Sequence, residues 1–253
     1  MFKPNRLLLL VALAGACAAM RAQTALVEKG KPKARITLAS GTDVNRRAAA
    51  ILQRFVKETS GAELPVVEEA KPVHGTIVIG EPTSEAADDG FVIDCGSGVL
   101  HIKSAGGKGA IYGVCDLLER YVGVDYLAKD CYTLTPSRDI TVPAVHRVQT
   151  PAFRYRQTES YCCDDPLYYD WFRHAKPSEV FPDNMWVHTF DRLLPSSVYG
   201  KTHPEFYSFI NGERRPGKHS QWCLTNPDIF DIVARRVDSI FTANPGKNII
   251  SVS

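Results

Sequence analysis

Hydrophobic positions between Lys33 and Pro143 follow two periods, one typical of strands and one typical of amphipathic helices. Short apolar or alternating runs predict strands at residues 34–38, 76–79, 91–94 and 99–102. Apolar faces with helical spacing predict two helices. The first is capped by Thr42 or Asp43 and stopped by Gly61, and the second ends at Gly123. The order β-α-β-β-β-α-β predicts a small mixed α/β layer.

A linker at 143–151, bounded by prolines, separates this half from a second one with different spacing. Alternation predicts a strand at 153–156, and we also expect strands at 185–190 and 248–252. A short helix is expected after Pro166, and Asn226-Pro227-Asp228 predicts the start of a longer helix that closes at 244–246. Strands alternating with helices favour parallel βα units. Because the pattern stops inside a predicted strand, we expect the chain to be the first part of a longer protein.

Composition and charge exclude several classes of protein. The 253 residues are 44% hydrophobic and 23% charged, as in a globular protein rather than a disordered or fibrous one. With 30 basic and 28 acidic residues the net charge is +2, and no dense basic run predicts a nucleic-acid partner. No interior stretch approaches the roughly 20 apolar residues of a membrane span.

The first 22 residues have the anatomy of an export signal. Lys3 and Arg6 precede an apolar run at 7–19, and small residues near Ala22 offer cleavage points. We therefore expect a signal peptide at 1–22 and a mature chain in the periplasm or outside the cell. Cys17 follows Ala14-Gly15-Ala16, which lacks the large aliphatic residue of a lipoprotein box, so export without a lipid anchor is favoured.

Six cysteines remain after that segment, and an oxidising compartment permits disulfides among them. A chain of this length does not need them, so we expect buried free thiols with at most one bridge. The adjacent Cys162 and Cys163 lack the two-residue spacer of a thioredoxin-type pair. Thiol oxidoreduction at this pair is therefore the weakest of three functional hypotheses.

The segment 109–123, Gly-Ala-Ile-Tyr-Gly-Val-Cys-Asp-Leu-Leu-Glu-Arg-Tyr-Val-Gly, resembles a helix of known families. It is similar to the helix that closes the N-terminal α/β domain of β-N-acetylhexosaminidases and α-glucuronidases. The second half resembles domain-of-unknown-function family 4838 of secreted bacterial proteins. That resemblance rests on His203-Pro204-Glu205-Phe206-Tyr207, Asn211-Gly212, Cys223-Leu224-Thr225-Asn226-Pro227 and Ile250-Ser251-Val252-Ser253.

These resemblances imply a secreted glycoside hydrolase-like protein that acts on an oligosaccharide or polysaccharide and needs no cofactor. They imply an α/β domain at 23–148, followed at 149–253 by the first βα units of an incomplete TIM (β/α)8 barrel. In the related enzymes the catalytic carboxylates lie on later strands, so we expect them beyond Ser253. A non-catalytic glycan-binding or cell-surface scaffold protein stays open as the alternative, and so does the oligomeric state.

Sugar sites combine aromatic faces with hydrogen-bonding side chains, and in βα barrels they lie at the carboxyl ends of strands. The second half is rich in both types of residue. The candidate substrate-binding residues are Glu159, His188, Asp191, Arg214, Trp222 and Asn226.

Most of these candidates have a structural alternative. Glu159 suits a solvated loop, and His188 suits a hydrogen-bonded core position. Asp191 suits a surface pair with Arg192, Trp222 suits packing, and Arg214 suits a solvated turn. The histidines lack the short spacing of metal ligands, so no metal site is expected. No nucleophile elbow, phosphate loop or dinucleotide motif is present.

Overall fold

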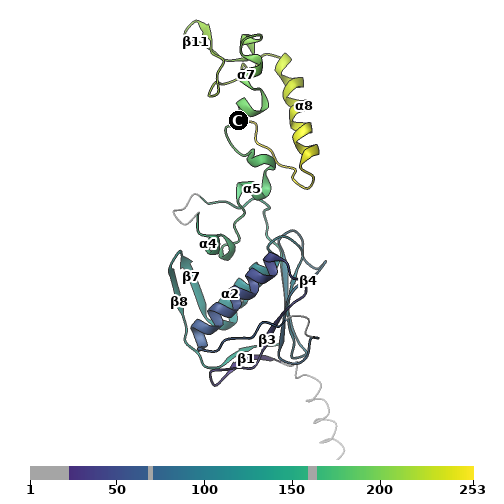
Figure 1. Ribbon diagram of the computed structural model, residues 1–253, viewed down its shortest axis with the longest axis vertical. Coiled ribbons are helices and arrows are strands. Elements are labelled where there is room, and N and C mark those ends of the chain that lie inside the picture. The colour runs from purple at the N-terminus through teal and green to yellow at the C-terminus, as the bar shows by residue number, and fades with distance from the viewer. Residues whose placement is uncertain (1–22, 68–70, 159–163) are drawn as a thin grey trace, which may run out of the picture. The chain divides into compact units, whose positions relative to one another are not determined.

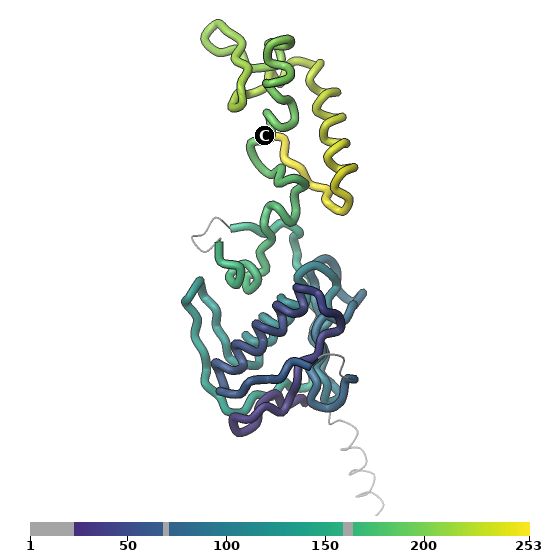
Figure 2. The backbone as a smooth tube through the Cα atoms, in the orientation of Figure 1, coloured from purple at the N-terminus to yellow at the C-terminus, as the bar shows by residue number. Residues whose placement is uncertain are grey.

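The computed structural model describes residues 23–67, 71–158 and 164–253, which form two compact units (Figures 1 and 2). The first unit comprises 23–153 and 164–173, and the second comprises 154–158 and 174–253. The predicted signal peptide and the Cys162–Cys163 pair lie outside the described residues. The predicted domain boundary after residue 148 stays a prediction.

A five-stranded mixed sheet organises the first unit, in the order β10-β5-β6-β4-β3. Its strands are β3 (Arg35–Leu38), β4 (Thr76–Pro82), β5 (Phe91–Cys95), β6 (Leu100–Ser104) and β10 (Val145–Gln149). Strands β3, β4 and β6 are parallel, whereas β5 runs antiparallel to both β6 and β10. Every strand predicted between 34 and 102 is confirmed.

Two helices pack on one face of this sheet, α2 (Asp43–Ser60) and α3 (Gly109–Leu117), and α3 continues as a π-helical turn η1 (Leu118–Val122). The predicted end signals of α2 are confirmed. The Thr42 side chain accepts a hydrogen bond from the Asn45 N–H, and Gly61 adopts φ 77°. In α3, a Cβ at Gly113 would lie 2.6 Å from Ile102 of β6. The glycine therefore lets the helix approach the sheet closely, which gives the glycine-containing motif a packing role.

Two smaller sheets complete the strands of the first unit. They are β2-β1-β9, from Lys31–Pro32, Thr24–Glu28 and Ile140–Val142, and the hairpin β7-β8, from Val124–Ala128 and Cys131–Leu134. Helix α2 lies between this hairpin and the main sheet (Figure 1).

The predicted linker at 143–151 is wrong, because it contains β10, the fifth strand of the main sheet. The sequence pattern did not predict this strand because several of its residues are polar. Arg147 points to the helix-covered side of the sheet, where a sequence pattern expects an apolar residue, and there it pairs with the buried Asp116.

Helix α4 (Pro166–Trp171) packs against the same core, in agreement with the helix expected after Pro166. Asp165 caps it by accepting hydrogen bonds from the Leu167 and Tyr168 N–H groups. Trp171 is 3% exposed and stacks on Tyr126 with ring centroids 5.0 Å apart. The helix therefore contributes an aromatic residue to a core built mainly from residues before 143.

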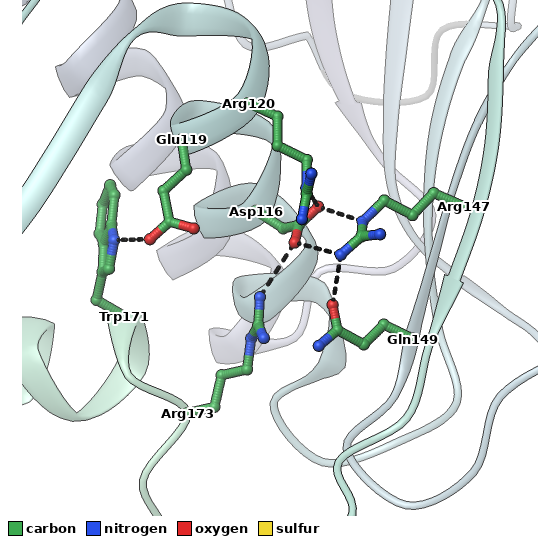
Figure 3. Close-up of polar contacts among 7 residues, drawn as sticks. All are labelled: Asp116, Glu119, Arg120, Arg147, Gln149, Trp171 and Arg173. Carbon is green, nitrogen blue, oxygen red and sulfur yellow. Dashed lines mark hydrogen bonds and ion pairs between the residues drawn. The ribbon is translucent and has the colours of Figure 1, made fainter.

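A buried carboxylate joins distant parts of the first unit (Figure 3). Asp116 of α3 is 1% exposed and accepts hydrogen bonds from Arg120 of η1, Arg147 of β10 and Arg173, which follows α4. The shortest donor–acceptor distance is 2.7 Å, from Arg147 Nε to Asp116 Oδ2. Such charge-assisted bonds compensate a buried charge only when its oxygens are well coordinated, as they are here.

The second unit is mostly helical and irregular. Its elements are α5 (Pro177–Val180), η2 (Pro182–Asn184), α6 (Phe190–Leu193), α7 (Ser196–Tyr199), η3 (Pro204–Phe206), β11 (Phe209–Ile210), β12 (Glu213–Arg214) and α8 (Asp228–Ala243). The predicted long helix is confirmed as α8. Among the described residues, no helix has the length and apolar character that a bilayer span requires.

The strands predicted at 153–156, 185–190 and 248–252 are wrong, because these segments have no regular strand structure. Positive φ at His188 interrupts the second of them, and Asp183 and Asn184, which come just before it, also have positive φ. Segments 185–190 and 251–253 still lie side by side, since the Ser251 N–H donates to the Met185 carbonyl oxygen. The α/β class is correct, but the incomplete barrel is not confirmed.

The Asp116 cluster generates a stability prediction. We expect Asp116→Asn to lower the free energy of unfolding by about 3–5 kcal/mol, because the substitution leaves three guanidinium groups around a neutral side chain. The matched control is Asp125→Asn on the exposed side of β7, which should change stability by less than about 0.5 kcal/mol. Urea unfolding of the two variants measures both values, and equal midpoints would contradict a structural role for the cluster.

Candidate functional site

A polar pocket of about 290 Å³ in the second unit is the best candidate for a functional site. Its volume is close to the lower end of the range for small-ligand pockets. Two stretches of chain and one further residue form it. The lining residues are His188, Phe190, Asp191, Lys218, His219, Ser220, Gln221 and Ser253.

The first stretch, 188–191, is held by the buried Thr189. The Thr189 N–H donates to the Ser253 carbonyl oxygen, and the Thr189 hydroxyl donates to the Ser251 carbonyl oxygen at 2.9 Å. His188 has φ 52°, a conformation that costs energy for a residue with a side chain. Backbone outliers of this kind concentrate at binding and catalytic sites.

The second stretch, 218–221, belongs to a loop whose base is closed by hydrogen bonds. The Ser208 N–H donates to the Gln221 carbonyl oxygen at 2.9 Å, and the Arg215 N–H donates to the Ser208 carbonyl oxygen at 3.1 Å. The Ser220 N–H donates to the Gly217 carbonyl oxygen. These backbone hydrogen bonds therefore fix the positions from which the side chains of 218–221 reach the pocket.

One wall of the pocket is aromatic. Phe190 is half-buried and stacks on Trp222, with ring centroids 4.1 Å apart and an angle of 20° between the planes. Trp222 is 6% exposed and belongs to the core of the second unit. The pocket is lined by Phe190, and Trp222 supports that ring from behind.

The polar side chains of the pocket fall into two groups. Asp191 is engaged, because its Oδ1 accepts hydrogen bonds from the Ser196 N–H at 2.9 Å and the Ser196 hydroxyl at 2.7 Å. By contrast, four exposed side chains make no hydrogen bond or ion pair with the described part of the chain: His188, Lys218, His219 and Gln221. The pocket therefore offers mainly unpaired hydrogen-bond donors, together with the ring of Phe190.

The structure brings His188 and Asp191 together in this pocket. Trp222 and Asn226 instead line a separate, more apolar cavity of about 530 Å³ beside α8, and the Asn226 Oδ1 accepts from the Asp228 N–H at the start of that helix. Arg214 lines neither cavity and donates to the Tyr207 carbonyl oxygen at 2.9 Å. Glu159 is outside the described residues. The binding role of all six stays a prediction.

Sequence reasoning missed six lining residues as candidates: Phe190, Lys218, His219, Ser220, Gln221 and Ser253. One signal pointed to the four of them at 218–221. Segment 193–224 has no periodicity and is rich in aromatic and basic residues, and long irregular connections of this kind are often functional. Phe190 fell inside a predicted strand, so its apolar character indicated packing alone.

The Cys-Leu-Thr-Asn-Pro segment that carries part of the family resemblance forms the turn into α8. The Cys223 N–H donates to the Phe206 carbonyl oxygen at 2.9 Å, and the Asn226 N–H donates to the Cys223 carbonyl oxygen at 2.8 Å. Hydrogen bonds with Thr225 and Arg214 lower the pKa of the Cys223 thiol, whereas burial raises the pKa of Cys115.

The four cysteines in the described ranges form no disulfide with one another, and only the first two of them are buried: Cys95, Cys115, Cys131 and Cys223. In the same ranges, no three His, Cys, Asp or Glu side chains are grouped so that they could hold a metal ion.

Residues 126–253 match the family described as domain of unknown function (DUF4838). No curated protein matches the chain.

Several solved structures are similar to about half of the chain. The GH20 β-N-acetylhexosaminidase from Streptomyces coelicolor A3(2) has 21% identity and a TM-score of 0.40, and the match covers 53% of this chain and 25% of that one. A β-N-acetylhexosaminidase from Bacteroides fragilis has 18% identity and a TM-score of 0.36, covering 54% and 24%.

A GH115 4-O-methyl-α-glucuronidase with specificity for decorated arabinogalactans has 17% identity and a TM-score of 0.41, covering 53% and 19%. The chain thus spans a quarter or less of the length of these three enzymes.

The burial of Trp222 favours the packing role and generates a stability prediction. We expect Trp222→Ala to lower the free energy of unfolding by about 3–5 kcal/mol, because a buried indole leaves a cavity. Phe230→Ala on α8 is the control, since Phe230 is 73% exposed and its loss should cost less than about 0.5 kcal/mol. Chemical denaturation followed by circular dichroism compares the two. If the Trp222→Ala variant is as stable as the unchanged protein, the packing role is wrong and a direct contact with the ligand is favoured.

Proposed function

Since the chain belongs to the family described as domain of unknown function (DUF4838), we propose that it is the glycan-binding part of a secreted glycoside hydrolase-like protein. The proposal rests chiefly on one observation, the pocket whose aromatic wall stands beside unpaired polar side chains. The sequence resemblance of segment 109–123 to the α/β domain of hexosaminidases and glucuronidases favours the same class of substrate.

The pocket residues suit the two chemical faces of a sugar ring. A pyranose has an apolar face of C–H groups that packs on an aromatic ring, and Phe190 offers such a ring. Trp222 stacks behind Phe190 and limits its motion, so little entropy is lost when the ring accepts a sugar.

Hydroxyl groups of the sugar need partners for their hydrogen bonds when they leave water. Gln221 offers both a donor and an acceptor, and the rings of His188 and His219 offer further sites. Because these side chains have no partner in the described part of the chain, ligand binding breaks no existing contact of theirs.

Hydrolysis of a glycoside ordinarily uses two carboxyl groups. Among the side chains that line the pocket only Asp191 is a carboxylate, and it is already hydrogen-bonded to Ser196. Under this proposal the pocket binds and positions a glycan, and another part of the full-length protein supplies the catalytic pair. A non-catalytic glycan-binding or cell-surface protein is the alternative, which a single carboxylate in the pocket fits equally well.

The proposal includes export. Residues 1–22 have the pattern of a secretory signal, and glycan polymers are met in the periplasm or outside the cell. The predicted location and the predicted substrate class are therefore consistent with each other.

Binding of oligosaccharides to the purified protein, measured by calorimetry, tests the proposal. We expect His219→Ala and Gln221→Ala each to weaken binding about 2- to 10-fold, the loss typical of one hydrogen bond, with an unchanged unfolding midpoint. His203→Ala is the matched control, because His203 is exposed in the same unit but does not line the pocket. Equal effects of the two histidine substitutions would contradict the site.

An assay of chromogenic glycosides separates binding from catalysis. We expect the 253-residue chain to hydrolyse none of them, because its pocket has one acidic side chain, Asp191, which is already hydrogen-bonded to Ser196. If the purified Asp191→Asn variant still hydrolyses a glycoside, the chain contains an active site that does not depend on this pocket.

A further inference from the structure

We infer that the pocket selects a negatively charged sugar, one that bears a carboxylate or a sulfate group, and that Lys218 is the residue that determines this specificity. The inference rests on the proposed function and narrows its substrate class.

The charges around the pocket are unequal. Lys218 makes no ion pair with the described residues, so its ammonium group has no protein counter-charge there. The one negative side chain of the pocket, Asp191, already accepts two hydrogen bonds from Ser196. An anionic ligand would meet a free positive charge, with the one acidic side chain of the pocket already hydrogen-bonded.

The loop that carries Lys218 strengthens this imbalance. Between 213 and 219 it contains one acidic residue, Glu213, against three basic ones, Arg214, Arg215 and Lys218. All four are exposed, so the potential that they create extends to the mouth of the pocket. The base of this loop is closed by the hydrogen bonds of Ser208, which hold the positive segment beside the cavity.

The unpaired donors also favour an anion over a neutral sugar. An ammonium group has three N–H donors and no acceptor, and the ring of His188 or His219 can donate as well. Carboxylate and sulfate groups are acceptors only, so they match such a set of donors. A neutral sugar would displace water from Lys218 without supplying a counter-charge, which is the basis for discrimination against it.

The positions of the lining residues also indicate which part of the ligand binds at each side of the pocket. The ring of Phe190 takes the apolar face of the sugar, and the acidic substituent is bound at the 218–221 side of the pocket. The carboxylate of a uronic acid and the sulfate of a sulfated sugar share this chemistry, so binding measurements must distinguish them.

Calorimetry with three matched oligosaccharides provides the test: an oligogalacturonide, the corresponding neutral galacto-oligosaccharide and its sulfated form. We expect at least one anionic ligand to bind about two- to fivefold more tightly than the neutral one, the range for one partly exposed ion pair. Binding should weaken with added salt. The better anionic ligand identifies which acidic group the pocket prefers.

Lys218→Gln should remove the preference by weakening the binding of the anionic ligand, whereas Lys201→Gln, an exposed lysine of the same unit outside the pocket, should keep it. Equal unfolding midpoints of the two variants exclude misfolding as the cause. Tight binding of the neutral ligand alone, or a preference that survives in Lys218→Gln, would overturn this inference and leave the proposed function standing. If none of the three oligosaccharides binds, both this inference and the proposed function are overturned.

Discussion

The burial of one carboxylate governs the first unit. Asp116 is 1% exposed, and a lone charge at that depth would be strongly unfavourable. Three guanidinium groups compensate it, and two of them, on Arg147 and Arg173, come from segments remote along the chain (Figure 3). The need to satisfy Asp116 therefore favours both the addition of β10 to the sheet and the packing of the α4 segment on α3.

Helix α4 contributes a second buried carboxylate, Asp170, which is also compensated by basic side chains. Asp170 is 3% exposed and accepts a hydrogen bond from Arg47 of α2 at 2.6 Å, and Lys108 lies 3.8 Å away. Trp171 donates its indole N–H to Glu119, whose pKa is raised because burial disfavours the charged form. The polar contacts of Asp170 and Trp171 thus add to the aromatic packing of α4 and favour one orientation of the helix.

Local patterns were sufficient for much of the first unit and for little of the second. Helix α2 was predictable with both of its ends, because Thr42, Gly61 and the apolar stripe between them are local signals. Strand β10 was not, because Arg147 resembles a surface residue until the buried Asp116 is known. The predicted strand at 185–190 failed because its run of mainly apolar residues cannot reveal the positive φ of His188 or the side-chain hydrogen bonds of Thr189. For the pocket, composition indicated the right segment, but which residues converge depends on contacts between 188–191 and 218–221.

The central claim is that the glycan binds at these two converging stretches. Labelling the histidine rings and following their NMR signals during titration with oligosaccharides tests it directly, because the seven histidines are spread over both units. The account predicts shifts for His188 and His219, with those of His101 and His146 in the first unit unchanged. Shifts confined to the first unit, or none at saturating ligand, would contradict it.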